Sequence, residues 1–250
     1  MIHFFNFLYR HRYDIFFSFL LFILVVFMVI IFPKEETKYI INFMENKTFD
    51  IRQNIISKNK KVNQDIVIVT VDDPSYEYLT QKYGDWPIPR NVYAEIIEYI
   101  QSQKPKYVAL DLLFINSLNR IKGSDDKLIE SFKNYANTYT AINFDDFPPE
   151  MRTPPLLDDK IKSNVIFESN NIYPLNFLNC RMILPEIIGA TSNIGHINTP
   201  KSDDGFIRTI PLIVSYNNDY YLYMTLKLAV DYLNKYENQN ISDIYVDSNN

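Results

Sequence analysis

A single apolar segment, residues 15–32, decides where the rest of this chain can lie. Its sequence, IFFSFLLFILVVFMVIIF, is interrupted only by Ser18. Because a helix rises about 1.5 Å per residue, the segment nearly crosses a hydrocarbon core of about 30 Å. A cleaved signal peptide is the alternative, but the run is long for one and no small-x-small cleavage site follows it. We therefore predict a transmembrane helix over residues 15–32, preceded by a tail over residues 1–14.

Basic residues around this segment indicate its orientation. Arg10, His11 and Arg12 precede it, and the positive-inside tendency places them in the cytoplasm. Lys34 and Lys38 on the far side weaken the charge difference. The chain would then cross the cytoplasmic (inner) membrane once, with everything after residue 33 periplasmic or extracellular.

Residues 33–61 carry the spacing of a helical stalk. Positions that can form a seam recur at alternating intervals of four and three residues, which is a heptad pattern. They are Thr37, Ile41, Met44, Thr48, Ile51 and Ile55. The pattern fits two structures: an amphipathic helix on the domain's own core, or a coiled coil that joins two subunits into a homodimer.

Residues 66–71, IVIVTV, are expected to form a strand buried on both faces, as in a mostly parallel sheet. Asp72, Asp73 and Pro74 should end this strand, and Ser75 follows them. Open α/β sheets bind ligands at the carboxyl edge of their strands. We therefore predict that these polar side chains face a ligand crevice.

Residues 84–90, GDWPIPR, follow as a stiff loop. The loop holds Trp86, which is the only tryptophan of the chain, and two prolines that lower the entropy lost when it becomes ordered. Arg90 at its end could pair with the neighbouring acids or hold an anion.

The next segments predict a strand, helix, strand unit. A helix capped by Asn91, with its apolar face on residues 92–100, should connect the strand at 66–71 to a second buried strand at 107–114. Asp111 is a carboxylate within that second strand. It therefore needs a structural partner such as a backbone cap or Arg90, a place at the strand's mouth, or a ligand.

Shorter signals continue this pattern. They predict helices at 124–135, 184–189 and 222–233, with Ser124 as a cap, and strands at 139–144, 165–167 and 208–216, the last with Pro211 at an edge or bulge. A turn is predicted at 203–205, and the prolines between 148 and 155 mark an irregular excursion. The fold class is α/β: a single extracytoplasmic domain over residues 62–236, with a mostly parallel central sheet flanked by helices, then a polar tail over residues 237–250.

Composition excludes several kinds of site. Five glycines cannot form a Walker loop or a dinucleotide fingerprint at the required spacings. With one cysteine, and with His196 the only histidine beyond the apolar segment, no cysteine-rich or two-histidine zinc site can form. We interpret His196 as a turn or core residue that is hydrogen bonded to the backbone. A net charge of -5 disfavours nucleic acid as a partner, and no cofactor is predicted.

One metal chemistry stays open. Asp72, Asp73 and Asp111 could hold a hard divalent cation at the edge of the predicted sheet, which would permit hydrolase chemistry in the cell envelope. Acids at the end of a strand are also common as structural caps.

In their order and spacing, these motifs resemble the second type of CHASE domain, the extracytoplasmic sensory domains associated with bacterial cyclases and histidine kinases. The matching segments are residues 50–52, 66–75, 84–90 with Tyr93, 108–114, an acid at Asp125 or Asp126, residues 184–185, 195–198 and 203–212. Ile88 stands where the family often has a second tryptophan.

The resemblance implies an input domain that controls an adenylate or guanylate cyclase or, as a second choice, a histidine or serine/threonine kinase. The family pattern returns to the membrane after the domain, whereas no second long apolar segment follows here. We expect either the amino-terminal part of a longer receptor or a free-standing sensor that works through a partner.

A metal-dependent envelope hydrolase and a structural envelope adaptor are the alternative functions. An unknown small ligand or envelope signal would contact the strand ends and the two arginines. The predicted ligand-binding residues are Asp72, Asp73, Ser75, Trp86, Arg90, Asp111, Asp204 and Arg208.

Overall fold

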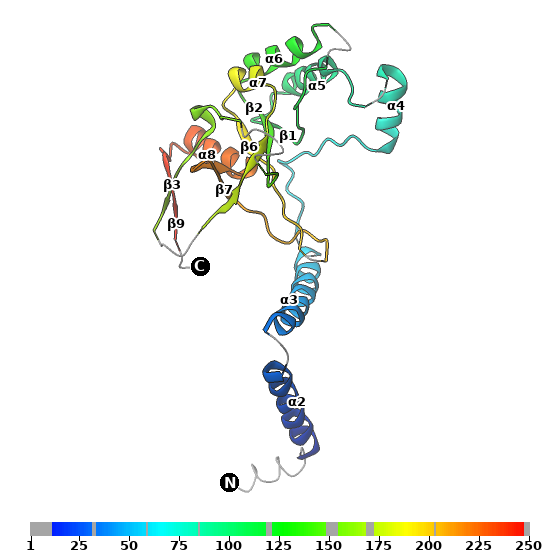
Figure 1. Cartoon of the computed structure of the whole chain (residues 1–250). Coiled ribbons are helices and arrows are strands. Elements are labelled where there is room, and N and C mark those ends of the chain that lie inside the picture. Colours follow the sequence, from blue (N-terminus) through cyan, green and yellow to red (C-terminus); the bar gives the residue numbers. More distant parts are fainter. Residues whose placement is uncertain are drawn as a thin grey trace. The chain divides into compact units, whose positions relative to one another are not determined.

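The structure is a computed structural model (Figure 1) that describes residues 12–31, 34–58, 60–84, 86–118, 122–148, 155–168, 173–202 and 204–247. The chain divides into two compact units, Met1–Thr70 and Val71–Asn250, and each is described by itself.

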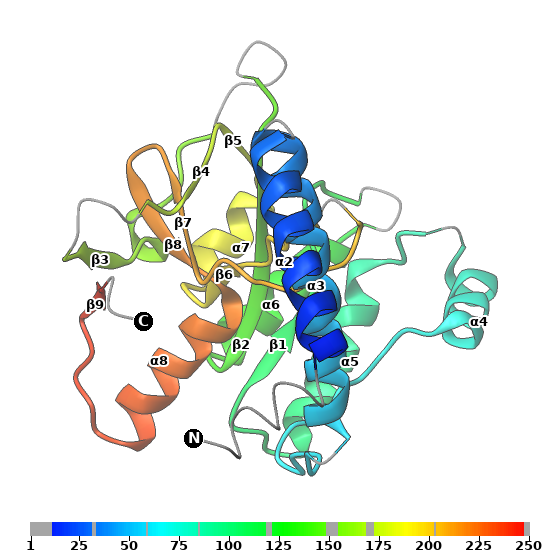
Figure 2. The ribbon, with the colours of Figure 1, turned by 90° about the horizontal axis from the view of Figure 1, so that it is seen from below.

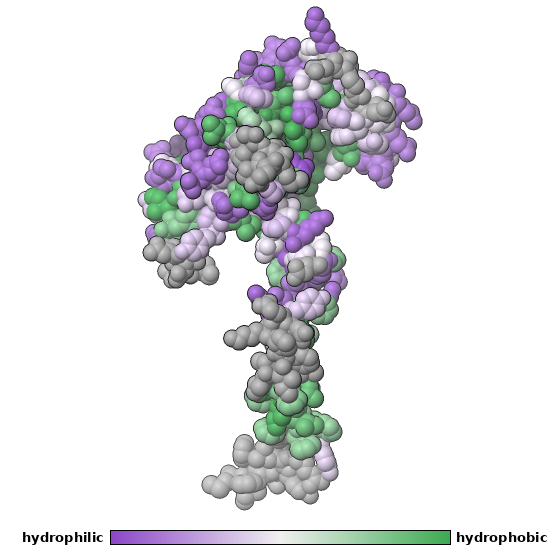
Figure 3. All heavy atoms as spheres, viewed as in Figure 1, coloured by the Kyte–Doolittle hydropathy of each residue, from purple (hydrophilic) through white to green (hydrophobic). Residues whose placement is uncertain are grey.

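The first unit contains two helices, α2 (Arg12–Ile31) and α3 (Lys34–Ser57). Large apolar side chains lie exposed along α2, among them Phe17, Leu21 and Phe22 (Figure 3). Within the described residues, no helix combines the length and the hydropathy needed to cross a membrane. The helix predicted over residues 15–32 is confirmed as a helix through Ile31, and its role as an anchor stays a prediction.

Helix α3 confirms a helical conformation for residues 34–57 of the stalk predicted over residues 33–61. Ile41, Met44, Ile51 and Ile55, four positions of the heptad pattern, are all more than half exposed. An apolar stripe that stays in water is unfavourable at about 25 cal/mol per Å². The stripe is therefore a surface for which a partner has to be considered.

The strand predicted at residues 66–71 is wrong. The segment forms no ladder with any strand among the described residues, and Val67 and Ile68 are each 81% exposed. β-branched residues favour an extended backbone, but a strand also requires a partner with free hydrogen-bonding groups. The sequence pattern reports the first condition and not the second.

The second unit is built on a short, mostly parallel sheet, as predicted. Strand β2 (Thr138–Asp145) lies between β1 (Val108–Leu110) and β6 (Ile194–His196), and both neighbours run parallel to it. Strand β5 (Asn179–Arg181) pairs antiparallel with the last three residues of β2. The side chains of β2 are buried or nearly so along its whole length, which makes it the centre of the core.

The strand predicted at 107–114 is correct in place but shorter, because only Val108–Leu110 pairs with β2. A strand, helix, strand unit is present, but it is not formed by the segments that were predicted to form it. The parallel pair is β1 and β2, with α6 (Ser124–Asn134) between them in the sequence. Asp111 lies exposed just after β1, at the strand's mouth.

Helices cover this sheet (Figure 2). Helix α5 (Arg90–Ser102) packs against α6, α6 packs against α7 (Pro185–Ala190), and α8 (Met224–Tyr236) packs against β2 and β6. The predicted apolar faces are confirmed, since Val92, Ile97 and Leu128 are buried. The predicted caps are wrong, because Pro89 and Gly123, rather than Asn91 and Ser124, hold the N-cap positions.

Smaller elements complete the unit. Strand β7 (Ile213–Tyr216) lies between β4 (Leu175–Phe177) and β8 (Asp219–Leu222), while β3 (Asn164–Phe167) pairs with β9 (Asp243–Val246). Helix α4 (Asp73–Tyr83) and the short 3-10 helix η1 (Asp159–Ile161) lie outside the sheets. Asn217 and Asn218 both have positive φ, which lets them form the tight hairpin between β7 and β8.

The strand predicted at 208–216 is only half correct. Residues 206–212 form no strand, and Phe206, Ile207, Ile210 and Leu212 are exposed, so that pairing begins at Ile213. Pro211 lacks the amide hydrogen that a ladder needs, which explains why the strand does not extend through it. Asp203 of the predicted turn and most of the proline-rich excursion lie outside the described residues, although Gly205 has the positive φ of a turn.

Candidate ligand-binding site

Two neighbouring cavities lie beside the loop that follows β1. One, of about 340 Å³, is lined by residues of that loop, α6 and α7, and the other, of about 510 Å³, is lined by residues 86–93 and 112–118. Leu118 lines both cavities. Their sizes are in the range of small-molecule sites.

Arg90 is the charged residue of the larger cavity. It is the first residue of α5, directly after Pro89, and its side chain is only 7% exposed. The guanidinium carbon lies 4.7 Å from the centre of the Phe114 ring, and Nη2 donates a hydrogen bond of 3.3 Å to the backbone carbonyl of Asn116. Burial lowers the pKa of Arg90, an effect that Tyr93 and Asp125 oppose.

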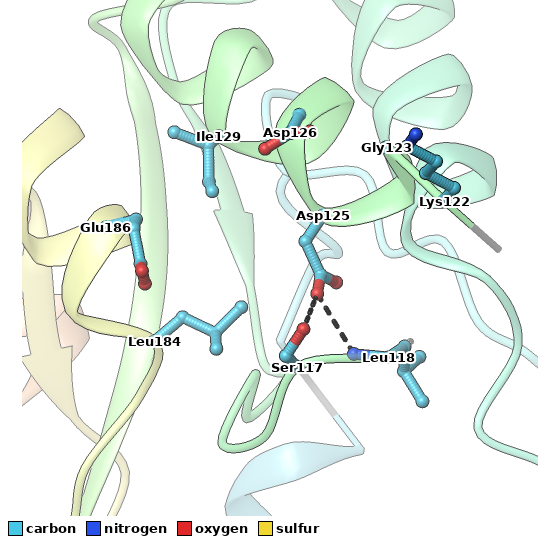
Figure 4. Close-up of a pocket in the computed structure, with 9 residues that line it drawn as sticks. All are labelled: Ser117, Leu118, Lys122, Gly123, Asp125, Asp126, Ile129, Leu184 and Glu186. Atoms are coloured by element: carbon cyan, nitrogen blue, oxygen red, sulfur yellow. Dashed lines mark hydrogen bonds between the residues drawn. The ribbon is translucent and has the colours of Figure 1, made fainter. Parts of the chain in front are cut away.

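Asp125 lines the smaller cavity and forms an ion pair with Arg90 of the larger one. It lies in the first turn of α6, where the helix dipole stabilises a carboxylate. Its Oδ2 accepts hydrogen bonds from the Ser117 hydroxyl and, at 3.0 Å, from the Leu118 amide (Figure 4). One oxygen of this carboxylate thus fixes the loop after β1.

One polar atom of each side chain in this pair is not satisfied within the described residues. Nε of Arg90 lies 3.8 Å from Oδ1 of Asp125, which is an ion pair but too long for a hydrogen bond. Both atoms are buried, and no described residue gives either of them a hydrogen bond. Leaving a buried polar group unpaired costs about 1–3 kcal/mol, so the pair is a costly arrangement in the absence of a third group.

The wall of the larger cavity is aromatic and aliphatic. Trp86, Tyr93, Leu112 and Phe114 line it, and the rings of Tyr93 and Phe114 meet edge to face at 5.4 Å. Burial raises the pKa of Tyr93, so its hydroxyl stays protonated at neutral pH. This wall offers an apolar surface next to the one guanidinium.

The smaller cavity has a more acidic rim. Asp126 and Glu186, from α6 and α7, and Lys122 are exposed around it, with Ile129 and Leu184 between them (Figure 4). Among the described residues, no three His, Cys, Asp or Glu side chains lie close enough to hold a metal ion. The two cavities together can bind a small molecule through ionic, hydrogen-bonding and apolar contacts.

The structure brings only two of the eight predicted ligand-binding residues into this site, Trp86 and Arg90. Asp72 caps α4, because its Oδ1 accepts a 3.0 Å hydrogen bond from the Ser75 amide and another from the Ser75 hydroxyl. Asp73 is exposed in the first turn of the same helix.

Asp204 and Arg208 line neither cavity. Arg208 donates two hydrogen bonds, of 2.8 and 2.7 Å, to the Asp204 carboxylate four residues earlier in the same loop. Asp111 is exposed after β1, and the structural partner suggested for it, Arg90, pairs with Asp125 instead. The eight residues therefore do not form one site.

Sequence reasoning missed Asp125 and the backbone of residues 116–118 as members of the site. The available signal was the acid at position 125 or 126 that opens the helix after a predicted strand. Spacing along the chain could not show that this acid meets Arg90, because their contact depends on how α5 packs against α6.

His196 is a core residue, as expected. It is fully buried in β6, its Nδ1 accepts a hydrogen bond of 3.3 Å from the Asn198 amide, and its ring lies 5.2 Å from that of Tyr223. Its Nε2 has no hydrogen-bond partner in the part of the chain that the structure describes. Burial lowers the pKa of His196 to about 3, so the imidazole is neutral in the folded protein.

Acid should therefore destabilise the protein through His196. In the unfolded chain His196 binds a proton below a pKa of about 6.5, whereas in the folded protein it stays neutral down to about pH 3. Its contribution to stability is therefore fully present at a pH well above 6.5 and is lost progressively below that pH. We expect a loss of about 2 kcal/mol between pH 7 and pH 5, measured by urea unfolding in detergent. A His196→Phe variant should lose most of this slope; an unchanged slope would contradict the assignment.

Comparison with known proteins gives one family. The family model described as CHASE2 domain matches residues 21–249, a range that contains α3 and both cavities. No curated protein and no solved structure matches the chain.

Proposed function

Because this chain belongs to the CHASE2 domain family, whose members are sensory extracellular domains of signalling receptors, we propose that it is the input module of a membrane-anchored receptor. The observation that carries the proposal is a family match spanning residues 21–249, together with a ligand-sized site inside that range. In this receptor the chain controls a nucleotide cyclase, with a histidine or serine/threonine kinase as the second choice.

The anchor of the proposed receptor is α2, whose exposed apolar side chains suit a hydrocarbon environment. The domain then lies outside the cytoplasm, with the amino terminus inside. Alkaline phosphatase joined after Asn250 is expected to be active, while green fluorescent protein joined at the same point is expected to stay dark. The opposite result would place the domain in the cytoplasm and overturn this topology.

The ligand acts through a two-state equilibrium. A ligand shifts such an equilibrium only as far as its affinities for the two states differ. The Arg90 and Asp125 pair is suited to this role, since it connects the starts of α5 and α6 to the loop after β1. A ligand that took over the two unsatisfied atoms would change how these three segments are held together.

The exposed stripe of α3 is the surface through which two copies associate. Its members recur with heptad spacing, and pairing would remove them from water. In membranes, an Ile51→Cys chain is expected to form disulfide-linked dimers on mild oxidation. A Gln53→Cys chain, with its cysteine on the opposite side of the helix, should form far fewer, and the native Cys180 is buried. Equal cross-linking at both positions would contradict a defined seam.

A hybrid receptor tests the output. Residues 1–250, joined through a transmembrane helix to an adenylate cyclase domain, should change cyclic AMP synthesis when the cavities are filled. The matched control is the same hybrid with Arg90→Gln and Asp125→Asn, which should not respond. Activity that no added small molecule alters in either hybrid would instead favour the structural adaptor.

A further inference from the structure

The geometry of Arg90 and Asp125 points to the class of ligand, and we propose that this pair binds a zwitterionic α-amino acid with an apolar side chain. This inference rests on the proposed sensory function of the same site. It is carried by the unsatisfied atoms of the pair, by their charges, and by the surfaces on either side.

The unsatisfied atoms form a matched donor and acceptor. Nε of Arg90 needs an acceptor and Oδ1 of Asp125 needs a donor, yet at 3.8 Å they do not satisfy each other. A carboxylate accepting from Arg90 and an ammonium donating to Asp125 would satisfy both, and because the two atoms are buried, the side chains have to turn toward the cavities for this. In an α-amino acid these two groups are held on one carbon atom, which fits the short distance between the protein atoms.

The charges of Arg90 and Asp125 disfavour ligands that carry only one charged group. A ligand with only a carboxylate would meet Arg90 but add a second negative charge beside Asp125. A ligand with only an ammonium group would do the reverse. Because a buried charge requires compensation, a ligand that is neutral as a whole and carries both charges leaves neither residue in excess.

The two cavities supply surfaces of different kinds on either side of the pair. The acidic rim at Asp126 and Glu186 favours the ammonium group on the side of Asp125. The apolar wall formed by Trp86, Tyr93 and Phe114 lies on the side of Arg90 and would receive an aliphatic or aromatic side chain. The larger cavity, with a volume of about 510 Å³, leaves room for leucine or phenylalanine.

Calorimetric titration of the full chain in detergent tests this proposal. The probes are L-leucine, its decarboxylated analogue 3-methylbutylamine, and its deaminated analogue 4-methylpentanoate, with L-phenylalanine as a second amino acid. We expect at least one amino acid to bind and both leucine analogues to bind at least tenfold more weakly than leucine, or not at all. Failure of both amino acids, or analogues that bind as tightly as leucine, would overturn the ligand class.

Variants locate the contacts. Asp125→Asn should weaken leucine at least tenfold and reduce the discrimination against 4-methylpentanoate, because the ammonium group loses its partner. Glu130→Gln, at an exposed position of the same helix that lines neither cavity, is the matched control and should change leucine binding less than threefold. Circular dichroism checks that each variant is folded, and if Asp125→Asn is not, the analogue series on the unmodified chain still decides.

The outcomes also separate this proposal from the function on which it rests. Leucine binding without any effect on the hybrid receptor would support the ligand class and contradict the sensory role. A hybrid that responds to another compound while no amino acid binds would overturn the ligand class alone.

Discussion

Replacing Gly195 by alanine is expected to destabilise the protein by about 3 kcal/mol. Gly195 is buried in β6, and a Cβ atom there would lie 2.4 Å from Cα and 2.8 Å from the backbone nitrogen of Met224, where α8 begins. A backbone atom cannot move aside as a flexible side chain can. The strand or the start of α8 would therefore have to shift, and urea unfolding of the chain in detergent measures the cost.

Gly189 provides the matched control for this substitution. It lies in α7, and a Cβ atom there would meet no heavy atom within 4 Å. Alanine has a higher helix propensity than glycine, so Gly189→Ala should leave stability unchanged or raise it by up to about 1 kcal/mol. If the two variants unfolded alike, the close approach of β6 to α8 would not be the cause.

The second large effect is expected from Asp125→Ala, at about 3 kcal/mol. The substitution leaves the Arg90 side chain, which is only 7% exposed, without its counter-charge. It also removes the acceptor that fixes Ser117 and the Leu118 amide at the start of α6. Chemical unfolding of the purified chain, compared with the unmodified protein, measures the loss.

A double-mutant cycle separates these two contributions. Arg90→Met removes the buried charge while keeping an apolar side chain of similar length. If the lone charge is the main cost, Arg90→Met with Asp125→Ala should be less destabilised than the sum of the two single variants, by about 1–2 kcal/mol. Strictly additive losses would show that the fixing of the loop, and not the ion pair, carries the effect.

Periodicity predicted the parts of this fold in which one helix face is buried. The apolar positions of α5 and α6, such as Val92, Ile97 and Leu128, recur with the helical repeat and lie in the core. The buried strand at 139–144 was also predicted, because β2 is enclosed on both faces and includes the apolar residues Ala141, Ile142 and Phe144.

The predictions that were wrong are those that depend on the pairing of one strand with another. Residues 66–71 and 206–212 are as apolar as β2, but no described strand completes them. Apolar composition records a preference for burial and an extended backbone, whereas a ladder requires a second segment at the right distance and register. Nothing local in the sequence encodes that second segment.

In the candidate site, too, local features were predicted from the sequence and contacts between distant segments were not. Trp86 and Arg90 were predicted because a short loop with two prolines delivers them. Asp72 and Asp204 were assigned to ligand binding from their place in motifs, yet each is engaged by a neighbour in its own segment, Ser75 and Arg208. Asp125 could not be identified as the partner of Arg90 from the sequence, because their contact depends on the packing of α5 against α6.

The exposed segment at residues 66–71 has a consequence for handling the protein. Six neutral residues, five of them Val or Ile, have no strand partner in the described part of the chain, and this composition favours cross-β stacking between molecules. In concentrated preparations this segment would be one starting point for aggregation. A single lysine introduced within the segment would act as a gatekeeper, so solubility can be changed without replacing any residue that lines the two cavities.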